Sequence, residues 1–247
     1  MKNKNMRIIN RLMFRLLPVQ ILLAVVGSIN GIVSSYFATN HLGIEAMSAV
    51  GLYGPISQLL GALSTVLVGG CAIICGKYLG SNQQDRVQDV FSLDLLISLI
   101  ISIVSISVLS FLALSDLTVI FTRDLTIRPI FNIYLLGQMI GIVPMMIANQ
   151  LPCFLSMENK GRRIMIASVV YIIVNLILDQ LFIVVLKLGA FGLSLASSLG
   201  MWIFMAVQTQ YFFTKGSHLR FIFKKIRWNE VINIITIGFP GAASYIY

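Results

Sequence analysis

The sequence predicts an all-α integral membrane protein, a six-helix transmembrane lobe followed by the start of a seventh helix. Two features of its composition support this: 57% of the residues are hydrophobic and only 11% are charged, whereas soluble domains carry about 25% charged residues. A third feature is the arrangement of the apolar residues. They form successive runs as long as the roughly 20 residues that cross a bilayer as a helix, which argues against a soluble domain.

The apolar runs divide the chain into four parts. A basic leader at 1–15 precedes the transmembrane lobe at 16–214, and a basic, amphipathic linker at 215–230 leads into the start of a second lobe at 231–247. The spans expected within the lobe cover approximately 16–38, 47–78, 90–114, 129–157, 164–185 and 193–213. The final run, 231–247, is near the lower length limit for a crossing.

Prolines and glycines inside these spans indicate where helices bend or pack closely. Pro55, Pro144 and Pro152 each remove a backbone hydrogen bond, which tends to kink a helix. Small residues also recur along one face of the second span and would let another backbone approach it. They are Gly54, Gly61, Gly69 and Gly76.

The linker and the run after it suggest an internal repeat. Apolar residues between Leu219 and Trp228 alternate with Lys and Arg, which is typical of a helix lying on the membrane surface. The following segment IGFPGAASYIY is similar to LLPVQILLAV in the first span. Because transporters are often built from repeats, we expect a second copy of the six-helix unit to begin near Trp228 and to be cut off.

The basic residues are distributed unequally between the two sides of the membrane. When successive loops are assigned alternately, fifteen of the eighteen Lys and Arg residues fall on one side, and only Arg123, Arg128 and Lys187 fall on the other. Cytoplasmic loops carry the excess of Lys and Arg, so we expect a multi-pass protein of the plasma (inner) membrane with a cytoplasmic N-terminus. The net charge of +9 is then explained by loops that contact membrane lipid. We expect membrane lipid as a partner and no nucleic acid.

Asp179 is the acid that the sequence places deepest in an apolar span. A carboxylate there costs roughly 2.5–3.5 kcal/mol on insertion scales. Tyr171, Asn175 and Asp179 are spaced four apart, which places them on one helix face. The three side chains therefore predict an ion or proton site turned toward the protein interior; the alternative is an acid satisfied by a neighbouring helix with a purely structural role.

For Asp94 and the three cysteines of the spans, the sequence predicts structural roles and no binding site. Asp94 is near the polar end of the third span, so we expect an interfacial residue. Cys71 and Cys75 share a helix face without an accompanying His or acid, and with Cys153 they are expected to be small buried side chains.

The sequence contains no recognisable enzyme constellation. It lacks a glycine-rich phosphate loop, an HExxH motif and a GxSxG motif. His41 and His218, the two histidines, fall in loops. We therefore do not expect an enzyme, and the classes to weigh are a transporter and a membrane scaffold that transports nothing.

Four segments, in the right order and at the right separations, resemble the N-terminal half of MATE-type (multidrug and toxin extrusion) transporters. They are HLGIEAMSAVGLYGPI after the first span, VGGCAIICGKYLGSNQQDRVQDV at the end of the second, VNLILDQLFI in the fifth and LGAFGLSLASSLG at the start of the sixth. The resemblance covers essentially the whole chain. It implies half of a twelve-helix, two-lobe antiporter that exports organic cations and other amphipathic compounds, driven by entry of Na⁺ or H⁺.

The resemblance also implies which residues bind the coupling ion. Many members combine an Asp in helix one with the Asn and Asp of helix five, which correspond to Asn175 and Asp179. The helix-one Asp falls on Ser34, so Asn30 and Ser34 offer polar oxygens but no charge. A small hydroxyl residue early in helix six corresponds to Ser197.

Beyond the ion site, the resemblance implies a substrate cavity lined by adaptable aromatic and methionine side chains. Tyr134, Met145 and Met146 are the candidates. An Arg often found after helix four falls on Ser156. No cofactor is expected beyond the coupling ion, and no metal beyond Na⁺ at Asp179.

Two other functions stay open. A lipid-linked oligosaccharide flippase of the same superfamily would need cations to hold a diphosphate, and no Lys or Arg is placed deep in a span. A truncated fragment that transports nothing would fit the length. It would lack a C-terminal lobe as its partner, unless a self-dimer enclosed a cavity.

Overall fold

The computed structural model describes residues 21, 24–29, 31–115, 117–214, 216–220, 222 and 228–246. All of the regular structure in this part of the chain is helical. Five of its helices are long and apolar enough to cross a membrane: α2 (Ile44–Gly80), α3 (Gln84–Leu114), α4 (Ile127–Met157), α5 (Gly161–Asp179) continued by the π-helix η3 (Gln180–Val185), and α6 (Gly189–Thr209) continued by the 3₁₀-helix η4 (Gln210–Phe213).

The first expected span lies partly outside the described residues. Residues 24–29 and 31–37 are helical and run into the π-helix η1 (Ala38–Leu42). Gly43, with φ of 87°, then joins this helix to α2. The second to sixth predicted spans correspond to the five long helices, and the fold class is confirmed.

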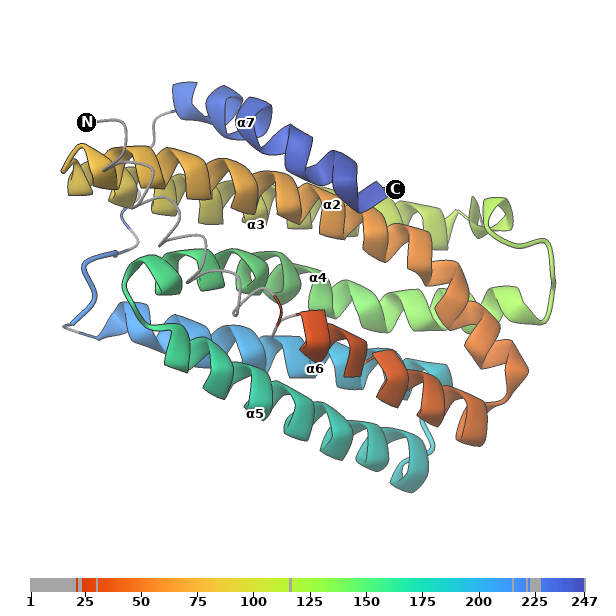
Figure 1. Cartoon of the computed structure of the whole chain (residues 1–247). Coiled ribbons are helices and arrows are strands. Elements are labelled where there is room, and N and C mark those ends of the chain that lie inside the picture. Colours follow the sequence, from red (N-terminus) through yellow and green to blue (C-terminus); the bar gives the residue numbers. More distant parts are fainter. Residues whose placement is uncertain are drawn as a thin grey trace.

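The kinks expected at proline are present in α2 but do not interrupt α4. α2 contains Pro55 and changes direction along its length, as the orange ribbon in Figure 1 shows. Pro144 and Pro152 lie within α4, which continues through both of them as a single helix. The other helices of the bundle can support such freed backbone groups.

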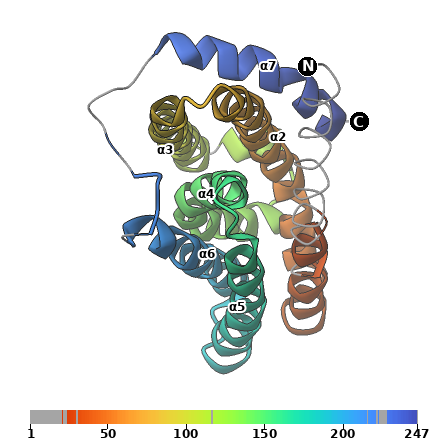
Figure 2. The same cartoon turned by 60° about the vertical axis from the view of Figure 1, so that its left-hand side comes forward.

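α4 occupies the centre of the bundle, with α2, α3, α5 and α6 around it (Figure 2). Its closest partner is α6. Gly137 and Gly141 lie directly against Ser194 and Ser198, where any side chain would overlap the serine hydroxyls. The Ser198 hydroxyl donates a hydrogen bond of 2.7 Å to the Gly137 carbonyl oxygen. Small residues thus bring these two backbones together, as is common between transmembrane helices.

A 3₁₀-helix, η2 (Leu117–Ile120), follows α3, and α7 (Asn229–Ile246) packs along α2 (Figure 1). The expected glycine stripe of α2 is only partly responsible for this contact. Gly69 lies near Gly238, but the tightest approaches are between Gly238 and the Val66 carbonyl and between Gly70 and the Ile234 carbonyl. Nothing lies within 4 Å of the position that a Cβ would take at Gly54. The stripe prediction therefore identified the correct helix but mostly the wrong residues.

The described part of the linker before α7 differs from the expected surface helix, whose residues 221 and 223–227 lie outside the described residues. Its described residues before Trp228 form no helix. The backbone N–H groups of His218 and Leu219 donate hydrogen bonds of 3.0 and 2.8 Å to Glu158 at the end of α4. Leu219 is buried in the core cluster that includes residues of α3 and α4, because this segment turns inward and bonds to the helix ends.

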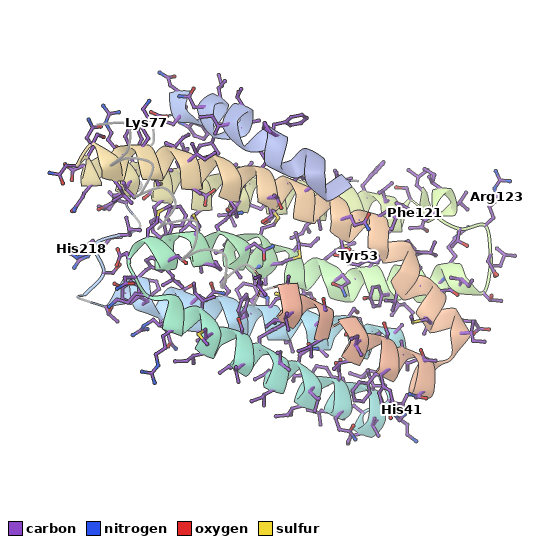
Figure 3. The ribbon with its side chains drawn as sticks, in the orientation of Figure 1. His41, Tyr53, Lys77, Phe121, Arg123 and His218 are labelled. Carbon is purple, nitrogen blue, oxygen red and sulfur yellow. The ribbon has the colours of Figure 1, made fainter. Side chains whose placement is uncertain are left out.

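The two ends of the bundle match the alternation used to assign the loops. In Figure 3, Lys77 and His218 lie at one end, and Phe121 and Arg123 lie at the other. The turns at 81–83 and 158–160 are therefore on the first side, with the described part of the linker. Among the cations assigned to the first side, Lys77 lies at this end, and Arg123 of the other side lies at the opposite end (Figure 3).

Candidate cation and substrate site

Asp179 lies where α5 changes from an α-helix to the π-helix η3. Its side chain is completely buried, and its Oδ2 accepts a hydrogen bond of 3.1 Å from Asn175 Nδ2. Its Oδ1 has no hydrogen-bond partner. Single π-helical turns within α-helices are frequent at functional sites, and here the turn begins directly after the buried acid.

Neighbouring helices fix the position of this pair. Tyr171, one turn before Asn175, packs its ring against Phe204 of α6 at a centroid distance of 5.4 Å. On the same helix, Gly200 lies so close that a side chain there would approach both Tyr171 and Asn175 Oδ1 to 3.1 Å. The absence of a side chain at Gly200 lets α6 cover the polar face of α5.

A cavity of about 370 Å³ is lined by residues of α4, of α2 and the helical segment before it, and of α5 and α6. Five of the predicted site residues line it: Ser34, Tyr134, Met145, Tyr171 and Ser197. The other lining residues are Gly27, Gly31, Ser35, Val50, Tyr53, Gly54, Ser57, Gln138, Gly141, Ile142, Ser198 and Met201. Asn175 and Asp179 are not part of the wall.

Tyr134 connects the cavity with the buried acid. Its ring meets that of Tyr53 edge-on, at a centroid distance of 5.7 Å, and its hydroxyl accepts a hydrogen bond of 2.9 Å from Gln138 Nε2. Tyr134 also lies close enough to Asp179 to interact with it electrostatically. Figure 3 shows Tyr53 well away from both ends of the bundle.

Of the other predicted residues, some face the cavity, one is buried away from it, and one lies outside the described residues. Ser34 faces the cavity with a buried hydroxyl that has no hydrogen-bond partner, while Ser197 bonds to the carbonyl of Leu193. Met146 is completely buried and does not line the cavity. Asn30 lies outside the described residues.

Sequence reasoning missed part of the wall, including Tyr53, Ser57, Gln138 and Met201. Gln138 is four residues after Tyr134, a spacing that places both on one face of α4. That signal was available in the sequence. The positions of Tyr53 and Ser57 depend on how α2 bends and packs, which the spacing alone does not determine.

The interpretation of Asp94 as an interfacial residue is wrong. Its side chain is completely buried, and α3 begins at Gln84, several residues before the predicted start of the span. It faces Cys71, Cys75 and Cys153. The statement that no acid accompanies the cysteine pair is therefore also wrong. No group of three His, Cys, Asp or Glu side chains within the described ranges is arranged to hold a metal ion.

Comparisons with known proteins agree on one family. The model of the MatE family matches residues 18–181. A comparison with curated protein sequences gives no match. Solved structures resemble the chain in fold at about one-fifth identity.

Three of these structures show how much of the fold is present. An outward-facing multidrug resistance MATE family transporter of the MOP superfamily is 22% identical, with a TM-score of 0.83, covering 95% of this chain and 52% of that chain. A MOP superfamily transporter from Pyrococcus furiosus is 21% identical, with a TM-score of 0.83 and the same coverage. A MATE protein in the bent conformation is 21% identical, with a TM-score of 0.84, covering 96% and 53%.

The chain thus spans about half the length of the structures that it resembles. The matched half contains the cavity and the Asn175–Asp179 pair. The family model extends from the first span to just beyond Asp179. The chain belongs to the MatE family and has the fold of an N-terminal lobe of a MATE transporter.

Proposed function

We propose that this chain is the N-terminal lobe of a cation-coupled antiporter that exports organic cations, with Asp179 as the coupling acid and Asn175 as its partner. The observation that carries the proposal is the buried Asp179 carboxylate. One of its oxygens has no hydrogen-bond partner, and it lies on the same face of α5 as Tyr171, a residue of the wall of the 370 Å³ cavity. Tyr134 belongs to that wall and lies near Asp179. Neutralising Asp179 by H⁺ or Na⁺ would therefore change the electrostatic potential at the cavity.

The chemistry of the cavity wall favours a cationic, partly apolar substrate. Three tyrosine rings, those of Tyr53, Tyr134 and Tyr171, offer faces that attract cations. Met145 and Met201 provide adaptable apolar surface. No Lys or Arg is among the described residues of the wall. A diphosphate would find no cationic partner there, which argues against the oligosaccharide flippase.

Coupling would work through a difference in ion affinity between two states of the lobe. An ion that binds Asp179 better in one conformation shifts the population toward that conformation. Ser34, whose hydroxyl is unbonded, and Tyr171 would provide further oxygens on the cavity side. The π-helix after Asp179 is the local element best placed to change its hydrogen bonding.

A complete transport cycle would need a second bundle, because alternating access moves two bundles around a shared site. The partner would be a C-terminal lobe or a second copy of this chain. We place the protein in the plasma (inner) membrane, in contact with lipid, with the end that carries Lys77 in the cytoplasm.

Binding measurements on the purified chain would test the ion and substrate site directly. A fluorescent organic cation such as ethidium should bind saturably, and Na⁺ or a lower pH should displace it. Asp179→Asn should remove this sensitivity, whereas Asp124→Asn, at an exposed acid between α3 and α4, should retain it. Absence of saturable binding, or unchanged displacement in Asp179→Asn, would contradict the proposal.

Labelling in intact cells would test the orientation. The three native cysteines are buried, so single cysteines at Lys77 and Arg123 can report on the two ends. A membrane-impermeant reagent should label position 123 and leave position 77 unlabelled. The reverse pattern would place the cation-rich end outside.

A further inference from the structure

A second acid, Asp94, is buried between α2, α3 and α4 and does not line the central cavity. Core residues around it include Phe91, Leu93 and Ile97 of its own helix. Neither of its carboxylate oxygens has a hydrogen-bond partner. The Cys71 thiol approaches Asp94, although its geometry falls short of a hydrogen bond. A bare carboxylate in such a position is strongly unfavourable.

No Lys, Arg or His among the described residues pairs with the Asp94 carboxylate. The titratable groups that face it are thiols, those of Cys71 and Cys75 on α2 and of Cys153 on α4. Toward the start of α3, Arg86 and Asp89 line a separate pocket with Tyr78 of α2 and Glu230 of α7. Arg86 lies over the Tyr78 ring at 5.8 Å, and the Tyr78 hydroxyl bonds to Glu230 at 2.7 Å.

Polar side chains continue from Asp94 toward the interior of the lobe. Ser98, one turn further along α3, is completely buried and its hydroxyl has no partner. Gln150, one turn before Cys153, donates a hydrogen bond of 3.2 Å to the Ser64 hydroxyl, while its Oε1 is unbonded. These residues therefore have hydrogen-bonding capacity that the protein does not use.

The direction of the helices places these groups in one column. α3 runs antiparallel to α2 and α4. Ser98 follows Asp94 along α3, and Gln150 precedes Cys153 along α4, so both residues are displaced from Asp94 and Cys153 in the same direction along the bundle. Ser64 lies two turns before Cys71 on α2 by the same rule. We call Asp94, Ser98, Gln150 and Ser64 the polar column.

We propose that Asp94 is a proton-binding carboxyl in a site of its own, with the Cys71 thiol and the Ser98 hydroxyl as the groups that its neutral form can hydrogen-bond to, and with Gln150 and Ser64 continuing the polar column beyond them. The carboxylate takes a proton from a hydronium ion and leaves water. The new O–H is a donor, and thiol sulfur and Ser98 Oγ can accept hydrogen bonds. A proton fits this set because no described cation compensates the charge.

The site would link proton occupancy to helix packing. A protonated Asp94 leaves the space between α2, α3 and α4 uncharged and lets the apolar residues close around it. Loss of the proton would create a charge that water must solvate, which favours separation of these helices. This inference does not require Asp179 to be the coupling acid or the chain to transport anything.

Infrared difference spectra of the whole chain in lipid vesicles, recorded between acidic and alkaline pH, would test the site. A protonated carboxyl has a C=O stretching band that a carboxylate lacks. Asp94→Asn should remove one such band from the difference spectrum, while Asp179→Asn should retain that band. Spectra of Asp94→Asn that coincide with those of the unmodified chain would overturn the proposal, because Asp94 would then not exchange a proton.

Two further variants keep the test decisive. If Asp94→Asn does not fold, Asp94→Glu should move the band, and an unmoved band would overturn the proposal. Ser98→Ala should shift the frequency of the Asp94 band, since it removes the hydroxyl that we propose as an acceptor for the protonated carboxyl. Ser107→Ala, at an exposed serine of the same helix, is the matched control and should leave the band in place. An unshifted band in Ser98→Ala would remove Ser98 from the site.

Discussion

Asp179 and Asp94 are both completely buried acids in membrane-spanning helices, but their surroundings differ. Asp179 accepts a hydrogen bond from the amide of Asn175 and lies at a helix irregularity near a cavity. Asp94 is surrounded by thiols and apolar side chains, and neither of its oxygens has a partner. The difference shows that burial of an acid does not by itself determine what the acid binds, because the neighbouring hydrogen-bonding groups also matter. A donor favours the charged form, and acceptors favour the neutral form.

The largest expected effect is the absence of transport by this lobe alone, and the two acids can be compared in transport only if the dye does move. Reconstituted alone into liposomes with a Na⁺ or H⁺ gradient, the 247-residue chain should not move a fluorescent organic cation, because one bundle cannot alternate access. Movement of the dye would contradict this expectation and point to a self-dimer. In that case Asp179→Asn should abolish the movement, while Asp94→Asn should change only its dependence on pH.

A smaller effect is expected from removing the donor to Asp179. Asn175→Leu deletes the amide that bonds to Oδ2, and leaving a buried polar group unsatisfied costs about 1–3 kcal/mol. Thermal unfolding, followed by a dye that reacts with the newly exposed cysteines, should therefore begin at lower temperature. Asn40→Leu, at an exposed asparagine, is the control. Equal unfolding temperatures for the two variants would show that the Asn175 bond contributes little.

The opposite sign is expected at Asp94. Asp94→Leu replaces an acid whose two oxygens have no hydrogen-bond partner by an apolar side chain next to an apolar cluster. It therefore removes the cost of burying an unsatisfied polar group, about 1–3 kcal/mol. Circular dichroism melts should show equal or higher stability, and a clear loss would indicate that Asp94 has a stabilising partner. The comparison between the acids would then fail.

The smallest effect is expected at an acid outside the membrane-spanning segments. Hydrogen bonds from the Thr126 hydroxyl and N–H, at 2.6 and 2.8 Å, hold the pKa of Asp124 below its ordinary value of 3.8. A depressed pKa contributes stability that is present above the ordinary value and is lost as the pH falls through the folded value. The unfolding temperatures of the unmodified chain and Asp124→Asn should therefore differ slightly at neutral pH and converge below about pH 3.8.

Patterns within one helix predicted the structure well. The apolar runs identified all five spans that the structure describes in full, and the four-residue spacing of Asn175 and Asp179 predicted a contact that the structure contains. Both inferences need only the helix repeat and the thickness of a bilayer.

Contacts between helices were predicted less well. Asp94 looked interfacial because its helix was expected to begin too late, and the burial of one residue depends on where the whole helix starts. Met146 was placed with Met145 in the cavity, although adjacent residues on a helix point in different directions. The contact of Gly70 with α7 depends on the crossing point of two helices, which sequence spacing does not give.

The central position of α4 has a consequence for synthesis. α2 and α3 leave the ribosome before α4, the helix around which both are packed. At about 5–20 residues per second, they remain in the membrane for several seconds before the central helix α4 is complete. During that interval Asp94 has only α2 and α3 beside it, and Cys153 has not yet reached the membrane. During assembly of the lobe, side chains that are buried in the folded protein are therefore exposed for a time. Asp94 is the group for which this exposure is most unfavourable.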